Sequence, residues 1–142
     1  MERVIKILEL TFSAAHYIKG HPKCSALHGH TYFVRNVEVL YDAPEGKFVD
    51  LGVIKGIIQE FDHTLLIPPE DAQFWLHLST ISGNMPFKDI PPCKLPFVEI
   101  PGGTTVENIA SLLAETIKAV QYVKSVRLEV FEGPNAGTVF ET

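Results

Sequence analysis

The sequence has little cysteine, no long apolar run and no excess of basic charge, and each of these features argues against a class of protein. Its two cysteines, Cys24 and Cys93, do not form the dense pattern of a secreted disulfide scaffold, so a cytoplasmic location is expected. No apolar stretch approaches the roughly 20 residues of a membrane-spanning helix, and the charged N-terminal stretch is unlike a signal peptide. The net charge of −5 argues against nucleic acid as a partner, because nucleic-acid-binding domains are usually basic.

The length of 142 residues suits a single domain, 1–142, and the hydrophobic pattern predicts its elements. β-branched and aromatic residues predict strands over 3–16 and 30–41, and two more strands in 125–142 around a Gly-Pro-Asn turn. Apolar residues at steps of three and four predict helices over 51–63 and 104–121. This order favours an α+β fold in which helices cover one face of an antiparallel sheet.

Local residue signals predict where the two helices begin and where regular secondary structure is interrupted. Asp50 is the expected N-cap of the first helix, and Thr104 followed by Glu107 matches a capping box at the start of the second. The segment at about 64–101 holds most of the ten prolines, so we expect an irregular, Pro-rich insertion without regular helix. Within this insertion, the stretches FWLHL and FVEI could pair as a small hairpin.

Three histidines form the most specific chemical pattern. His28 and His30 lie two residues apart at the start of a predicted strand, so their side chains share one face. His16 ends the preceding predicted strand, and an antiparallel hairpin would bring it to the other two. Three imidazoles that leave a fourth position open are typical of catalytic zinc. The alternative is three unrelated surface histidines, but the His-x-His pair beside a third histidine favours a metal site.

Two further groups could carry acid–base chemistry. Cys24 lies four residues before His28 and next to Lys23, where a lowered thiol pKa would suit a base or nucleophile; it could also be a small loop residue. Asp62 and His63 could act together as a proton carrier if the helix ends there or if a partner comes from elsewhere. A histidine stabilised by the helix dipole is the alternative.

Glu132 continues an apolar face of the predicted strand that carries Leu128 and Val130. A carboxylate on such a face needs a partner. A bound heterocycle with N–H donors would be one, and a structural arginine or a backbone cap would be another.

Six motifs in order resemble one known family: FSAAH, CSALHGH, VDLGVIK, DH, TVENIA and the strand-borne Glu132. They are similar to the 6-pyruvoyl-tetrahydropterin synthase / 6-carboxy-5,6,7,8-tetrahydropterin synthase family over most of the chain, except about residues 64–101. The resemblance implies the tunnelling fold, a four-stranded antiparallel sheet with two helices on one face. It also implies a homo-oligomeric barrel, a trimer or hexamer, with active sites between subunits, so that Asp62 and His63 could serve a neighbour's metal.

The resemblance also implies a chemistry. The Cys-x-x-x-His-Gly-His spacing is similar to that of the carboxy synthases of 7-deazaguanine (queuosine and archaeosine) biosynthesis, which convert 7,8-dihydroneopterin triphosphate to 6-carboxytetrahydropterin, acetaldehyde and triphosphate. Alternatives are a 6-pyruvoyl synthase or a lyase making a folate-type precursor, and a non-catalytic family member that binds a pterin or zinc. The implied residues are the Zn²⁺ ligands His16, His28 and His30, the catalytic Cys24, Asp62 and His63, and the pterin-binding Glu132, Thr105 and Glu107.

Overall fold

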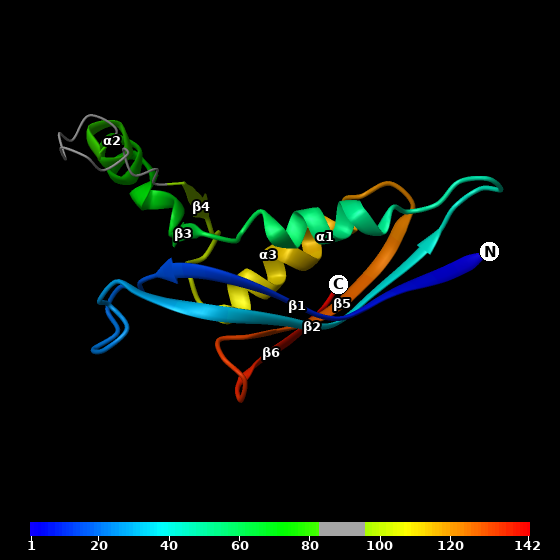
Figure 1. The fold of residues 1–142 in the computed structure, drawn as a ribbon, viewed down its shortest axis with the longest axis horizontal. Helices are drawn as coiled ribbons and strands as arrows, with labels where there is room; N and C mark the ends of the chain where they lie inside the picture. The colour runs from blue at the N-terminus through cyan, green and yellow to red at the C-terminus, as the bar shows by residue number, and fades with distance from the viewer. Residues whose placement is uncertain (83–95) are drawn as a thin grey trace, which may run out of the picture.

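A curled six-stranded sheet forms the frame of the molecule, with strand order β4-β3-β1-β2-β5-β6 (Figure 1). The computed structural model describes residues 1–82 and 96–142, without the side chains of 79–82. Its elements are β1 (Glu2–His16), β2 (His28–Asp42), α1 (Leu51–Gln59), β3 (Thr64–Ile67), the 3-10 helix η1 (Pro69–Asp71), α2 (Ala72–Ser82), β4 (Phe97–Glu99), α3 (Val106–Lys118), β5 (Val123–Phe131) and β6 (Gly137–Glu141).

The four predicted strands are present as an antiparallel unit, β1-β2-β5-β6. The predicted count of four is nevertheless wrong for the whole sheet, because β3 and β4 extend it. β3 pairs in parallel with the end of β1 at Ala14 and Ala15, and β4 pairs in parallel with β3. The added strands therefore lie at the end of β1 that carries His16.

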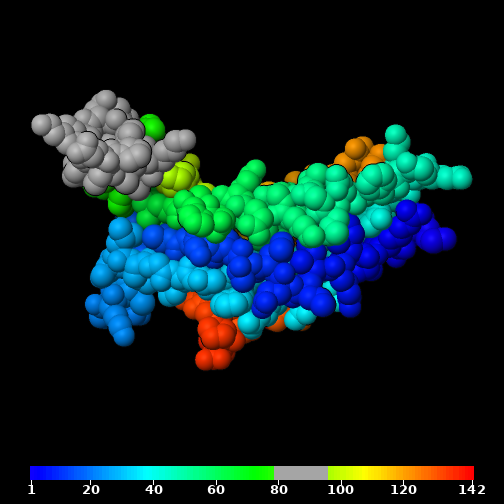
Figure 2. Space-filling model, in the orientation of Figure 1, coloured from blue at the N-terminus to red at the C-terminus, as the bar shows by residue number. Residues whose placement is uncertain are grey.

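Helices α1 and α3 lie along the same face of this sheet, as the sequence predicted (Figure 1). Their apolar stripes supply fully buried side chains to the core, among them Ile54 and Ile58 of α1 and Leu113 of α3. Figure 2 shows α1 laid along β1 on the outside of the molecule, while the turn between β5 and β6 projects from the opposite side. The sheet face beneath the helices is thus sealed by packing.

The helix boundaries confirm one predicted cap and correct another. The Asp50 side chain accepts a hydrogen bond from the Gly52 N–H, as expected of an N-cap. The second helix is capped by Thr105, not Thr104, because the Thr104 hydroxyl is used elsewhere: it donates to the Tyr17 carbonyl at 2.6 Å. The first helix ends at Gln59, so the predicted end at residue 63 was four residues too late.

The insertion is more regular than predicted. The stretch FWLHL belongs to α2, and residues 97–99 pair with β3, so the predicted hairpin between them is wrong. Pro68 and Pro69 precede α2 and do not interrupt it; a proline at the first turn of a helix loses no needed hydrogen bond. Residues 83–95, Cys93 included, lie outside the described part. No helix among the described residues is long and apolar enough to cross a membrane.

Candidate functional site

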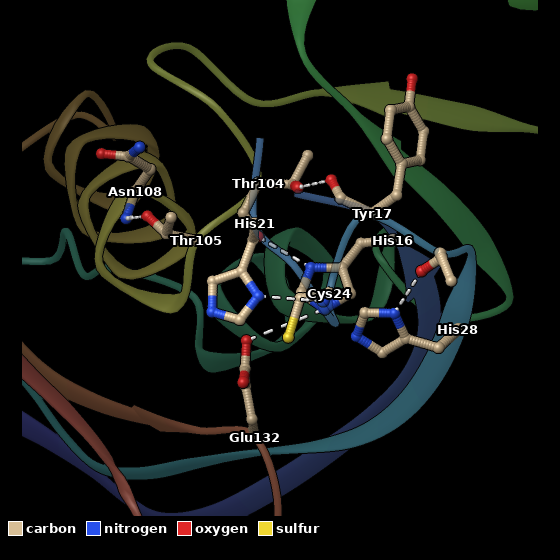
Figure 3. A network of polar contacts seen from close by, with 10 residues as sticks. His16, Tyr17, His21, Cys24, His28, Thr104, Thr105, Asn108 and Glu132 are labelled. Carbon is tan, nitrogen blue, oxygen red and sulfur yellow. Dashed lines mark hydrogen bonds and ion pairs between the residues drawn. The ribbon is translucent and has the colours of Figure 1, made fainter. Parts of the chain in front are cut away.

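The three predicted histidines converge at the ends of β1 and β2. Figure 3 shows two of them, His16 and His28. Strand register pairs His16 directly with His28, and His30 with Ala14. The ring centroids lie 4.6 Å apart for His16 and His28 and 4.9 Å apart for the other two pairs. One nitrogen from each ring lies within 4.8 Å of the other two, so small rotations of the rings bring all three to one metal ion.

Backbone carbonyls set the orientation of two of these rings. His16 Nδ1 lies 2.8 Å from the carbonyl oxygen of Thr104, and His28 Nδ1 lies 2.6 Å from that of Ala26. A carbonyl only accepts, so each Nδ1 carries the proton and each Nε2 presents its lone pair to the centre. Metal-binding histidines ordinarily make such a contact through the ring nitrogen that does not bind the metal.

The electrostatics keep the buried ring neutral. Burial lowers the pKa of His16 below its ordinary value; this outweighs the Thr104 hydrogen bond and the charge of Glu132, and His28 and His30 lower it further. A neutral imidazole is the form that binds a metal. The Nε2 atoms of His16 and His30 are also buried without a hydrogen-bond partner among the described residues, a costly state that a bound cation would relieve.

Tyr32 and Glu132 extend the histidine group along the sheet. Tyr32 follows His30 on the same face of β2, and its centroid lies 5.5 Å from the His30 ring. A Glu132 oxygen lies 3.9 Å from His16 Nε2. Glu132 also lines a pocket of about 460 Å³ that includes Glu107 and the β5–β6 turn. We call the group His16, His28, His30, Tyr32 and Glu132 the histidine pocket; Glu132 is the member of this group that lines the cavity.

Cys24 lies in the loop between β1 and β2 and is partly buried. Its carbonyl accepts from the Ile18 N–H at 2.7 Å, and its own N–H donates to His21 Nδ1 at 3.0 Å. In Figure 3 the Cys24 side chain is drawn among His16, His28 and Glu132. His21 thus holds the loop backbone, because its Nδ1 is used as a hydrogen-bond acceptor within the loop.

Asp62 and His63 do contact each other, through a turn that follows α1. His63 adopts a positive φ of 59°, which allows its Nδ1 to lie 2.8 Å from Asp62 Oδ2. The other Asp62 oxygen accepts from the Ser13 N–H at 2.8 Å, and this bond, followed by the one to His63, lowers the Asp62 pKa. The His63 side chain is 84% exposed, and among the described residues no hydrogen bond or ion pair joins it to Cys24 or the three histidines.

The two remaining predicted residues lie at the start of α3. The Thr105 hydroxyl accepts the Asn108 N–H at 3.4 Å as the N-cap, and Glu107 lines the same pocket as Glu132. The structure therefore brings Glu107 and Glu132 together, and gives Thr105 a capping role that the sequence had assigned to Thr104. Neither contact tests the pterin-binding role, which stays a prediction.

The sequence reading missed a hydrogen-bonded group that joins the insertion to the site. Asp71 accepts from the Tyr17 hydroxyl and from Lys19 Nζ, both at 2.6 Å, and Trp75 Nε1 donates to the Tyr17 hydroxyl at 2.8 Å. We call these four residues the Asp71 brace. The position of Tyr17 directly after His16 was the only available signal, because the partners come from residues 71–75.

Tyr32 was also missed, although its signal was present. It continues the period-2 series of His28 and His30, but a tyrosine in an apolar strand is ordinarily a core residue. Its ring does pack in the core, stacked on Phe12 with centroids 4.9 Å apart. The unusual feature is its hydroxyl, which is buried with no partner among the described residues.

Sequence comparison places this geometry among known proteins. A *Methanocaldococcus jannaschii* protein provisionally named 6-carboxy-5,6,7,8-tetrahydropterin synthase is 36% identical over 118 residues, covering 76% of this chain and 71% of that protein. The *Bacillus subtilis* protein named 6-carboxy-5,6,7,8-tetrahydropterin synthase is 31% identical over 110 residues, covering 74% and 64%. The *Haemophilus influenzae* protein of the same name is 25% identical over 134 residues, covering 90% and 92%.

Structure comparison supports the fold. The crystal structure of *Plasmodium vivax* 6-pyruvoyl tetrahydropterin synthase aligns with a TM-score of 0.61 at 14% identity, covering 100% of this chain and 98% of that one. The *Plasmodium falciparum* structure gives 0.57 at 15% identity, with 99% and 98% covered. The family model described as 6-pyruvoyl tetrahydropterin synthase matches residues 7–142. The resemblance seen in the sequence is therefore confirmed: this chain belongs to the 6-pyruvoyl tetrahydropterin synthase family.

Proposed function

We propose that the chain is a zinc-dependent 6-carboxy-5,6,7,8-tetrahydropterin synthase, a lyase that converts 7,8-dihydroneopterin triphosphate to 6-carboxytetrahydropterin, acetaldehyde and triphosphate. The observation that carries the proposal is the group of three histidines with ligand nitrogens within 4.8 Å. The Cys-x-x-x-His-Gly-His spacing and the names of the relatives support the carboxy product.

The donor set fits zinc. Three imidazoles leave a fourth position for a ligand, and two of them already have the backbone carbonyl partner at Nδ1 that such sites use. Bound zinc would act as a Lewis acid on the substrate's side-chain hydroxyls. His16, His28 and His30 would hold it, and the nearby Glu132 carboxylate would add favourable charge.

The other residues would divide the remaining tasks. Glu132 would accept the N–H donors of the pterin ring, with Glu107 on the wall of the same pocket and Thr105 next to it in sequence. Cys24 would take a proton from the substrate's side chain. His63, held by Asp62, would carry protons in later steps. Because its ring is exposed, it would do so at the site of another subunit.

Product analysis tests the proposal. Purified protein loaded with one equivalent of zinc is incubated with 7,8-dihydroneopterin triphosphate, and the pterin product is identified by mass spectrometry. We expect 6-carboxytetrahydropterin together with acetaldehyde. A 6-pyruvoyl or 6-hydroxymethyl product would assign the chain to another activity of the family, and an unchanged substrate would contradict the enzyme assignment.

We further propose a homotrimer or hexamer with shared active sites. Among the described residues β6 is an edge strand of the sheet, and the outer backbone groups of such a strand can pair with another chain. The large exposed fraction of His63 is explained if it completes a neighbour's site. Light scattering at micromolar concentration should give a mass of three or six chains, and a monomer would contradict both ideas.

Mixing two inactive variants tests the sharing directly. Cys24→Ala and His63→Ala proteins are unfolded together, refolded as a mixture and loaded with zinc. If each site takes Cys24 from one subunit and His63 from another, random assembly restores roughly a quarter of the sites. No recovery, with each variant alone folded and oligomeric, would place both residues on the same chain's site.

A further inference from the structure

The polar atoms of the histidine pocket leave one feature that the proposed zinc site does not explain. Among the described residues, the buried side-chain atoms without a hydrogen-bond partner are His16 Nε2, His30 Nε2 and the Tyr32 hydroxyl. A metal ion would use the two nitrogens. The Tyr32 hydroxyl, on a side chain with 0% exposure, would still have no partner. Such a group costs free energy in the folded state, so its retention requires a reason.

Strand register places Tyr32 opposite the carboxylate of the histidine pocket. Phe33 pairs antiparallel with Phe131 of β5, so the same register continued by one residue sets Tyr32 opposite Glu132. On its other side Tyr32 pairs with Phe12 and stacks on that ring. Its centroid lies 5.5 Å from the His30 ring and 6.0 Å from the His16 ring. The Tyr32 ring therefore packs beside the histidines, at the strand position opposite Glu132.

The chemistry of the two neighbours is complementary. Glu132 is a carboxylate and accepts hydrogen bonds, whereas a tyrosine hydroxyl can donate one. A pterin presents N–H donors next to ring-nitrogen and carbonyl acceptors. A carboxylate alone serves only the donors, and an acceptor buried in this pocket without a donor would weaken binding.

We propose that the Tyr32 hydroxyl is a second ligand-binding group of this site: it donates a hydrogen bond to an acceptor atom of the heterocycle that Glu132 holds by its N–H groups. This inference rests on the proposed function, because it takes the ligand to be a pterin. It assigns a specificity role to a residue that otherwise packs as core. The hydroxyl has no partner in the free protein because its partner is the ligand.

The substitution Tyr32→Phe removes the hydroxyl and keeps the ring that stacks on Phe12. Neopterin serves as the probe, and its intrinsic fluorescence reports binding to the zinc-loaded protein. We expect the Kd for neopterin to rise about three- to tenfold, the effect of losing one neutral hydrogen bond. Zinc content should stay the same as in the parent protein. Thermal unfolding without neopterin should be unchanged or up to about 4 °C higher, because an unpaired buried hydroxyl is gone.

The matched control is Tyr41→Phe, at the other end of β2, where the side chain is also buried. It should leave neopterin affinity unchanged. Equal affinity for the parent and Tyr32→Phe proteins, or a lower Tm with unchanged affinity, would show that the hydroxyl is structural and would overturn the inference alone. If the parent protein binds no neopterin while it binds zinc, the proposed function fails and the inference falls with it.

Discussion

The histidine pocket and the Asp71 brace are neighbours, but they differ in how far their polar side-chain atoms are hydrogen-bonded. The pocket contains every buried side-chain polar atom that lacks a hydrogen-bond partner among the described residues. The brace, from the insertion and the loop after β1, joins its members by hydrogen bonds of 2.6 to 2.8 Å. Unpaired buried groups cost stability, while paired ones stabilise. Unpaired buried atoms are expected at the proposed ligand site. The paired ones of the brace fix a segment of the chain in place.

One residue connects the two regions. Thr104 donates through its hydroxyl to the Tyr17 carbonyl at 2.6 Å, and its own carbonyl lies 2.8 Å from His16 Nδ1. Tyr17 belongs to the brace and His16 to the pocket. The insertion is therefore attached one residue from His16, a proposed metal ligand, and substitutions can test whether the two regions act separately or together.

The largest effect should come from removing a ligand in the pocket. His28→Ala should lose zinc and, with it, all turnover, because a catalytic zinc site ordinarily needs three protein ligands and only two imidazoles would remain. His77→Ala is the control, since His77 is exposed on α2. Metal content by mass spectrometry after dialysis measures the result. Full zinc occupancy in His28→Ala would show that the proposed ligand set is wrong. Loss of zinc in His77→Ala would mean that the insertion affects metal binding in the histidine pocket.

The second effect separates chemistry from binding within the pocket. Cys24→Ala should keep zinc and pterin binding and lose about 10²- to 10⁴-fold in turnover, the usual contribution of a positioned acid or base. Ser25→Ala, next to it and exposed, should turn over normally. Steady-state kinetics together with zinc content provide the readout. Normal turnover in Cys24→Ala would make the thiol a loop residue and leave His63 as the stronger candidate base.

The two regions also differ in how well the sequence predicts them. The period-2 alternation of β1 and β2 is enough to place His16 opposite His28 and to put His30 on the same face. In the insertion, the rule that proline breaks helices gave a wrong result. The prolines at 68 and 69 precede α2, where they are tolerated, so counting them concealed a helix. The parallel pairing of β3 with β1 is a tertiary contact with no local signal.

A third prediction tests the pocket at its other end. Glu132→Ala should keep zinc and weaken pterin binding by about 2–3 kcal/mol, because the donors of the ring lose a charged acceptor. Glu129→Ala on the same strand is the control, since that carboxylate already pairs with Asn36 Nδ2 at 2.9 Å. Fluorescence titration gives both affinities. Unchanged pterin affinity in Glu132→Ala would show that the pterin does not bind at Glu132.

The smallest effects should come from the brace. Asp71→Asn keeps the shape but weakens the bonds from Tyr17 and Lys19, and should lower Tm by about 2–4 °C with zinc content unchanged. Glu70→Gln is the matched control: its carboxylate lies 3.6 Å from Lys19 Nζ and is 64% exposed, so its loss should cost less. Zinc loss in Asp71→Asn would show that the brace acts on the pocket through Thr104.

The pH dependence of the Tm difference between the parent protein and Asp71→Asn shows whether the charge of Asp71 causes it. The hydrogen bonds from Lys19 and then Tyr17 lower the Asp71 pKa below its ordinary value. A carboxyl whose pKa is lowered by folding stabilises the native state above its unfolded pKa of about 3.9, and that contribution is lost as the pH falls through the folded value. The Tm difference between the parent protein and Asp71→Asn should therefore stay constant from pH 7 to 5 and shrink below about pH 4. Scanning calorimetry across this range measures it. A difference at pH 3 as large as that at pH 7 would mean that Asp71 acts through packing and not through its charge.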